Sequence, residues 1–89
     1  MNKKIILLRQ KIEAVDRGII EGLAKRQLLV KIIAQEKQKT HLNVSDRIRE
    51  LELQRLRQEL AHKYDLDLEF IEKIYQLIIR ESRKIQKRI

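Results

Sequence analysis

The sequence predicts an all-α protein, and two observations support this class. The 89 residues contain no Pro and two Gly, and they are dominated by Leu, Ile, Lys, Arg, Glu and Gln, most of which favour helix. Apolar residues also recur in steps of three and four over long stretches, which is the period of a helix that buries one face. The length suits one domain, so we expect a single domain over residues 1–89.

The first predicted helix is unusually long and spans residues 2–39. Its apolar stripe consists of Ile5, Leu8, Ile12, Val15, Ile19, Leu23, Val30 and Ile33. Such a helix is roughly 55–60 Å long, whereas a compact chain of this size has a diameter of about 30 Å. Because the rest of the chain can cover only part of the stripe, we expect a second copy to cover the remainder in an intertwined homodimer.

A break at residues 40–45 precedes a second, shorter predicted helix that runs to about Lys63. Asn43 or Ser45 can serve as its N-cap, and Asp46 lies in its first turn, where a carboxylate interacts favourably with the helix dipole. Its apolar positions are Ile48, Leu51, Leu53, Leu56 and Leu60.

The third predicted helix follows a short connection, Tyr64–Leu66. Asp67 is its expected N-cap, and the helix runs from Leu68 to near the C-terminus. Its apolar face is formed by Ile71, Ile74, Ile78, Ile85 and Ile89, with Tyr75 and Ile79 at the edge.

The formal net charge of +8 suits a nucleic acid, an anionic lipid or a small anionic substrate, although Lys and Arg can also simply solvate helix faces. The apolar run from Ile5 to Leu8 is shorter than a secretory core, and no stretch approaches the ~18 apolar residues of a membrane span. The chain has no Cys, which suits a reducing compartment. We therefore expect a cytoplasmic protein without a membrane partner. Neither His41 nor His62 has metal-ligand spacing with another His, so no metal site is expected.

Polar residues interrupt the apolar faces of all three predicted helices. The candidate site residues on these inner rows are Arg26, Lys37, Asp46, Glu50, Ser82 and Gln86, and Arg9 lies at the edge of the first stripe. Burying a charge is unfavourable unless the charge is paired. These groups can pair internally, as Arg26 or Lys37 with Asp46 or Glu50, or they can line a polar pocket inside a helical bundle. The excess of cations would suit an anionic ligand.

The order of these residues along the chain is informative. The segment Leu8–Asp16 is followed by Arg26 and Lys37, then by Asp46 with the pair Arg49-Glu50, and finally by Ile78-Ile79, Ser82 and Gln86. This ordered set resembles the all-helical (AroQ-class) chorismate mutases over nearly the whole chain. One departure is the loop before Asp46, which lacks the Pro that the family usually has there.

The resemblance implies an intramolecular [3,3] rearrangement of chorismate to prephenate, for phenylalanine and tyrosine biosynthesis, without a cofactor or metal. It implies four catalytic residues. Lys37 and Gln86 donate hydrogen bonds to the ether oxygen of chorismate. Arg26 binds a carboxylate, and Glu50 meets the ring hydroxyl.

The resemblance also implies four substrate-binding residues and a shared site. The partner subunit's Arg9 binds the other carboxylate of chorismate, so each site uses both chains. Asp46 lies near the ring hydroxyl, and Ser82 and Arg49 support carboxylate binding less directly.

Two alternatives stay open at this point. An isochorismate-pyruvate lyase would use the same scaffold, but the complete set of Asp46, Glu50 and Gln86 favours the mutase. A non-enzymatic basic helical dimer could bind nucleic acid, with its cations on an outer face. A dimer that binds nucleic acid on an outer face does not explain the polar residues on inward rows, so we expect no nucleic-acid partner.

Overall fold

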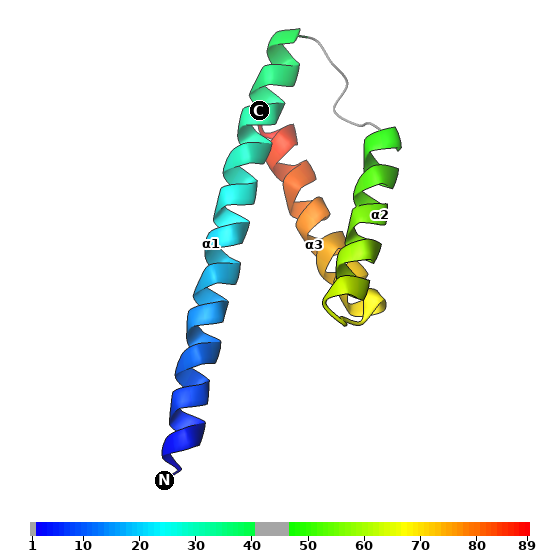
Figure 1. Ribbon diagram of the computed structural model, residues 1–89. Helices are drawn as coiled ribbons and strands as arrows, with labels where there is room; N and C mark the ends of the chain where they lie inside the picture. Colours follow the sequence, from blue (N-terminus) through cyan, green and yellow to red (C-terminus); the bar gives the residue numbers. More distant parts are fainter. Residues whose placement is uncertain (1, 41–46) are drawn as a thin grey trace.

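The computed structural model describes residues 2–40 and 47–89, and its regular structure there is entirely helical. The helices are α1 (Lys3–Thr40), α2 (Arg47–Lys63) and α3 (Leu68–Lys87) (Figure 1). The all-α class and the three predicted helices are therefore confirmed. The caps predicted at Asn43 or Ser45, and the first-turn position of Asp46, lie outside the described residues.

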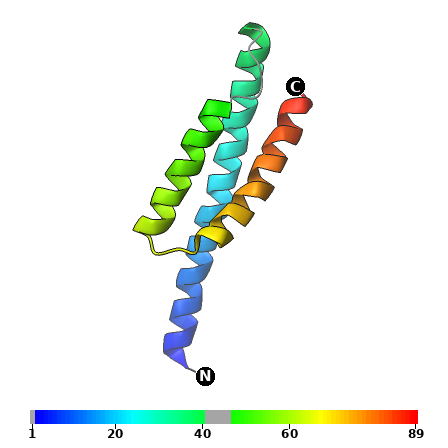
Figure 2. The same cartoon turned by 90° about the vertical axis from the view of Figure 1, so that its right-hand side faces the viewer.

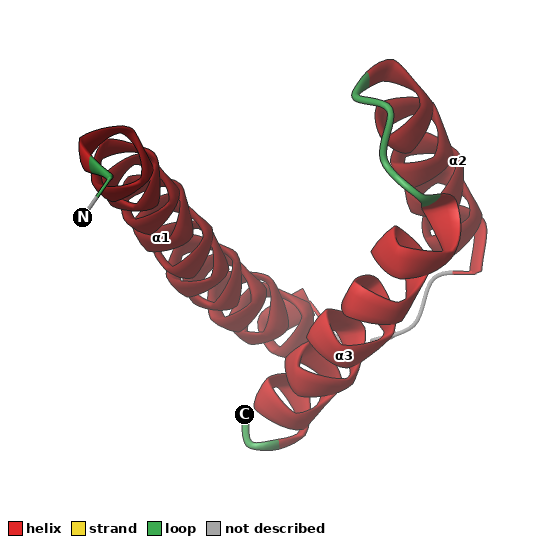
Figure 3. Ribbon diagram, turned by 90° about the horizontal axis from the view of Figure 1, so that it is seen from below, coloured by secondary structure: helices red, strands yellow, loops and turns green. Residues whose placement is uncertain are grey.

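Helix α3 packs against both other helices, whereas α1 and α2 lie on different sides of it. Seen from below, α1 forms one arm of a V and the α2–α3 pair forms the other (Figure 3). The protomer measures 59 × 25 × 16 Å and has a radius of gyration of 17.0 Å, against about 12 Å for a compact chain of this length. The N-terminal half of α1 projects beyond the other two helices (Figure 2). None of the described helices is long and apolar enough to cross a bilayer.

Local hydrogen bonds explain where the helices begin and end. The Asn2 side chain accepts from the backbone N–H groups of Lys4 at 2.9 Å and Ile5 at 3.3 Å, and so caps the start of α1. The predicted cap of α3 is confirmed, because the Asp67 carboxylate accepts from Phe70 N at 3.0 Å.

The turn between α2 and α3 is a Schellman motif. Leu66 N donates to Ala61 O at 2.8 Å and Asp65 N donates to His62 O at 3.2 Å. Asp65 has a φ of 53°, a left-handed conformation that Asp adopts more readily than most residues. The short turn sends α3 back along α2, which sets the two helices side by side.

Few described residues are buried in a single protomer. They are Ala34 in α1, Ala61 in α2, and Ser82 and Ile85 in α3. The stripe on the N-terminal half of α1 stays in solvent, with exposed fractions between 46% and 63% for Ile5, Leu8, Ile12, Val15 and Ile19. The prediction that the two shorter helices cover only part of α1 is confirmed.

An ion pair between Arg57 and Glu72 ties α2 to α3. Arg57 Nε and Nη2 donate to the two carboxylate oxygens of Glu72 at 3.2 and 3.3 Å. The guanidinium also lies 5.1 Å from the centre of the Tyr75 ring, in cation–π geometry. The exposed fractions of the Arg57 and Glu72 side chains are 14% and 29%, so water screens this pair less than it screens a surface pair.

We expect Arg57→Ala to lower the free energy of unfolding by about 2 kcal/mol, because it leaves the half-buried Glu72 carboxylate without its partner. Urea unfolding at a fixed protein concentration measures this. Arg55→Ala, an exposed arginine of the same helix, is the matched control and should change stability by less than about 0.5 kcal/mol. Equal losses of unfolding free energy in both variants would show that the Arg57–Glu72 ion pair does not stabilise the fold specifically.

Candidate functional site

A cavity of about 1060 Å³ is lined by the C-terminal half of α1 together with α2 and α3. Five of the predicted site residues line it: Lys37, Arg49, Glu50, Ser82 and Gln86. Apolar side chains complete the wall, with Ile33, Leu53 and Ile79 each from a different helix. Residues far apart in the sequence thus surround one space large enough for a small molecule.

Arg26 and Ser82 join α1 to α3 next to this cavity. Arg26 Nη1 donates to Ser82 Oγ, and Ser82 Oγ donates to the carbonyl of Ile78 at 2.9 Å. A helical Ser commonly bonds the carbonyl one turn earlier, which holds its hydroxyl in place for a second partner. Ser82 is buried and Arg26 is half-buried, so the guanidinium is held at the α1–α3 contact.

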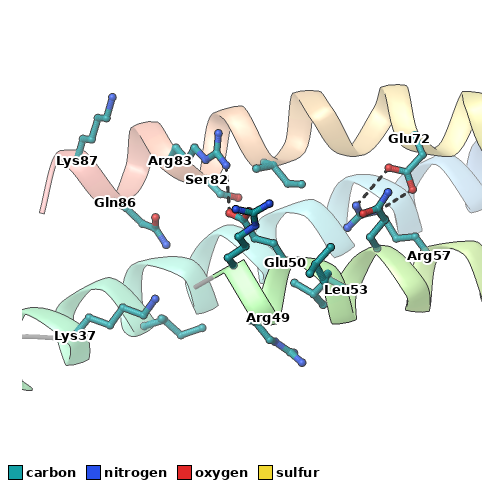
Figure 4. Close-up of a pocket in the computed structure, with 15 residues that line it drawn as sticks. Lys37, Arg49, Glu50, Leu53, Arg57, Glu72, Ser82, Arg83, Gln86 and Lys87 are labelled. Atoms are coloured by element: carbon teal, nitrogen blue, oxygen red, sulfur yellow. Dashed lines mark hydrogen bonds and ion pairs between the residues drawn. The ribbon is translucent and has the colours of Figure 1, made fainter. Parts of the chain in front are cut away.

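Lys37 and Gln86 approach the cavity from opposite helices. Lys37 lies eleven residues after Arg26, which is about three helical turns and keeps both on one face of α1. Gln86 lies one turn after Ser82 on α3. Both side chains are half-buried, and their polar ends point toward each other (Figure 4). The structure thus brings together two hydrogen-bond donors of different helices.

The two predicted residues of α2 differ in their orientation. Glu50 accepts from Arg83 Nη2 at 3.3 Å, across the gap between α2 and α3. Arg49 donates to Glu52 at 3.2 Å, and its guanidinium points away from Ser82 and Gln86 (Figure 4). Of the internal pairings considered from the sequence, Arg26 with Glu50 is not formed, since each has the different partner given above.

One predicted site residue, Arg9, is not brought together with the others. Arg9 is exposed on the projecting half of α1, and the helix places it about 25 Å from Arg26 along the axis. It therefore lies away from the cavity of its own chain. Asp46 lies outside the described residues.

Sequence reasoning missed several cavity residues, of which five carry charge: Arg47, Arg57, Glu72, Arg83 and Lys87. Arg83 directly follows Ser82 and precedes Gln86 by three positions, a spacing that keeps it on the same side of α3 as Gln86. Among the described residues, the cavity is lined by six cationic side chains and two carboxylates, an excess that favours an anionic ligand. The cations are Lys37, Arg47, Arg49, Arg57, Arg83 and Lys87, and the carboxylates are Glu50 and Glu72.

Comparison with known proteins places this arrangement in a family. The chain is 35% identical over 88 residues to a bifunctional chorismate mutase/prephenate dehydratase of Buchnera aphidicola, covering 99% of this chain and 23% of that protein. It is 33% identical over 78 residues to the bifunctional chorismate mutase/prephenate dehydratase of Escherichia coli, covering 88% of this chain and 20% of that protein. The chain thus spans about a quarter or less of the length of these curated relatives.

A relative of similar length is also known. The chain is 28% identical over 87 residues to a chorismate mutase of Methanocaldococcus jannaschii, covering 98% of this chain and 88% of that protein. Residues 8–87 match the family described as chorismate mutase type II. The match includes every predicted site residue, from Arg9 to Gln86. By this match over most of its length, the chain belongs to the chorismate mutase type II family.

Proposed function

We propose that this chain is a chorismate mutase, which converts chorismate to prephenate. The observation that carries the proposal is the position of Lys37 and Gln86, two donors of different helices that point toward each other in a cation-lined cavity. Family membership supports the same activity. Residues 1–89 would form a single catalytic domain that acts in phenylalanine and tyrosine biosynthesis in the cytoplasm.

Binding of the two carboxylates would hold the substrate in a folded conformation. The rearrangement breaks a C–O bond and forms a C–C bond within one molecule, so the bond-forming carbons must be held close together. Arg26 would bind one carboxylate, because its guanidinium is already oriented by Ser82. Ser82 and Arg49 would support that binding less directly. Arginine suits the task because its planar fork can bond both oxygens of a carboxylate.

Lys37 and Gln86 would stabilise the charge that develops during the reaction. As the C–O bond breaks, negative charge grows on the ether oxygen. Two donors held in advance at that oxygen stabilise the transition state more than the ground state, and one such donor typically contributes about 10²–10³ in rate. Their half-buried positions on opposite helices fit this role.

Glu50 would accept a hydrogen bond from the ring hydroxyl of chorismate. Its carboxylate lines the cavity from the first turn of α2, close to the row that carries Ser82 and Gln86 on α3. Asp46 is proposed to act near the same hydroxyl, on the strength of the family resemblance alone.

We further propose that the chain works as an intertwined homodimer. The protomer exposes 8349 Å², whereas a folded monomer of 10.8 kDa exposes about 5,500 Å². The excess is about 2,800 Å² for each protomer, so two protomers would together bury about 5,600 Å², which is the size of a large permanent interface. A second chain lying on the exposed stripe of α1 would cover this area. The partner subunit's Arg9 would then supply the second carboxylate ligand, which explains why Arg9 lies far from the cavity of its own chain.

The test of the activity is the loss of chorismate absorbance after the purified protein is added, with prephenate identified as the product. We expect turnover of chorismate and no pyruvate release from isochorismate. Pyruvate release without prephenate formation would assign the lyase reaction instead. Inactivity on both substrates, in a protein shown to be folded, would refute the proposed function.

A further inference from the structure

The Arg83–Glu50 ion pair connects two helices beside the cavity. Arg83 Nη2 lies 3.3 Å from Glu50 Oε1, and both side chains line the cavity. Arg83 reaches across from the α3 row that also carries Ser82 and Gln86 (Figure 4). Glu50 lies in the first turn of α2, where the backbone leads directly into residues outside the described part of the chain.

The Arg83–Glu50 ion pair contributes little to the stability of the fold. The exposed fractions of the Arg83 and Glu50 side chains are 62% and 55%, and exposed ion pairs contribute little to folding because water and salt screen them. The other cross-helix ion pair between α2 and α3, Arg57–Glu72, is far less exposed. A large effect of Arg83 on activity would therefore reflect the site and not the fold.

The geometry leaves one oxygen of Glu50 for a ligand. Arg83 donates to Oε1, and none of the described residues donates to Oε2. A carboxylate on a flexible side chain is a better acceptor for a fixed hydroxyl when its other oxygen is already held, because less rotamer freedom is lost on binding.

We propose that Arg83 is a positioning residue, which holds Glu50 so that its second oxygen accepts the ring hydroxyl of chorismate. This inference rests on the proposed chorismate mutase activity and on the role of Glu50 in it. Arg83 itself touches no reacting atom in this arrangement. The experiment distinguishes this role from two others: direct binding of a substrate carboxylate, and general attraction of an anion to the cavity.

The experiment measures kcat and KM for chorismate in Arg83→Ala, Glu50→Ala and the double variant. We expect Arg83→Ala to raise KM about tenfold and to change kcat less than about threefold, because a hydroxyl contact made equally in the ground and transition states affects mainly KM. In the Glu50→Ala background, Arg83→Ala should change kcat/KM by less than about twofold, since a residue that acts through Glu50 has nothing left to position. Arg83→Lys, which keeps a cation, should recover most of the loss.

A matched control separates positioning from general attraction of the anion. Arg80→Ala removes the same charge from an exposed site of α3, three residues before Arg83 and outside the cavity lining. It should leave kcat/KM within about twofold of the wild type, because Arg80 does not line the cavity and water and salt screen an exposed charge. The melting temperatures of all single variants should stay within a few degrees of each other.

Two other results would contradict the proposed role of Arg83. Additive effects of Arg83→Ala and Glu50→Ala would mean that Arg83 binds the substrate directly, and would overturn the inference. Equal losses of kcat/KM in Arg83→Ala and Arg80→Ala would mean that Arg83 acts only by general attraction of the anion. That result would also overturn the inference. Both results need an active wild type, whereas an inactive wild type overturns the proposed function together with this inference.

Discussion

Arg9→Ala and Arg26→Ala should each be nearly inactive alone and should recover activity when mixed. Each variant lacks one carboxylate ligand in both sites of the proposed dimer, and the loss of substrate alignment should lower kcat/KM by about 100-fold or more. In a mixed dimer, one site collects both defects and the other keeps both arginines. Random exchange of equal amounts makes half of the dimers mixed, so activity should return to about one quarter of the wild-type level.

The measurement is the chorismate turnover of the mixture after refolding, with subunit exchange followed by native mass spectrometry. Arg17→Ala is the matched control on α1, because Arg17 is exposed and lies off the apolar stripe. It should keep activity within about twofold of the wild type. Exchange without recovered activity would contradict a site shared between chains. An active monomer of 10.8 kDa in sedimentation would contradict the dimer itself.

Gln86→Glu should convert an enzyme with a flat pH profile into one that works better in acid. The amide of Gln86 can donate to the ether oxygen at any ordinary pH, so kcat/KM of the wild type should change little across neutral pH. A carboxyl group donates only when protonated, and an unperturbed glutamic acid has a pKa of about 4.3. Near pH 7 the introduced carboxylate would face the developing negative charge, and we expect a loss of about 10²–10³ in kcat/KM.

The direction of this pH dependence follows from protonation. As the pH falls, the introduced carboxylate gains a proton, becomes a donor and restores part of the activity. The measurement is kcat/KM against pH for both proteins, within the range where each stays folded by circular dichroism. Gln76→Glu, the same change at an exposed site of α3, should retain the flat profile. If Gln86→Glu were as active as the wild type at pH 7–8, Gln86 would be a structural residue of α3 and not a donor to the breaking bond.

Much of the fold could be predicted because it depends on local interactions. The apolar stripe of the first helix recurs in steps of three and four residues without a Pro, and it predicted one continuous helix. The observed bounds of α1 differ from the predicted bounds by one residue at each end. The cap at Asp67 was also predictable, since a short acceptor side chain before an apolar helical pattern satisfies N–H groups that the helix cannot. The length of α1 also implied that two shorter helices would leave part of its stripe uncovered.

The site was predictable only in part, for a physical reason. Inward-facing Arg26, Lys37, Ser82 and Gln86 interrupt apolar rows, and helical periodicity alone places such residues on the buried side. The partner of each side chain depends on how the helices pack, and that information is absent from the period of a single helix. Thus Arg26 with Ser82, and Glu50 with Arg83, could not be paired in advance.

The sequence by itself determined the helices, their inward polar rows and, through the order of those residues, the family. Only the tertiary structure decided that α3 lies between α1 and α2, that Lys37 and Gln86 meet at one cavity, and that Arg83 belongs beside Glu50. The reason is that secondary structure follows from hydrogen bonds and periodicity within a few residues, whereas a site depends on contacts between residues distant in sequence. Arg83 shows the difference. Helical periodicity cannot distinguish a cation that only solvates the end of α3 from one that contacts the site, whereas the packed helices place Arg83 beside Glu50.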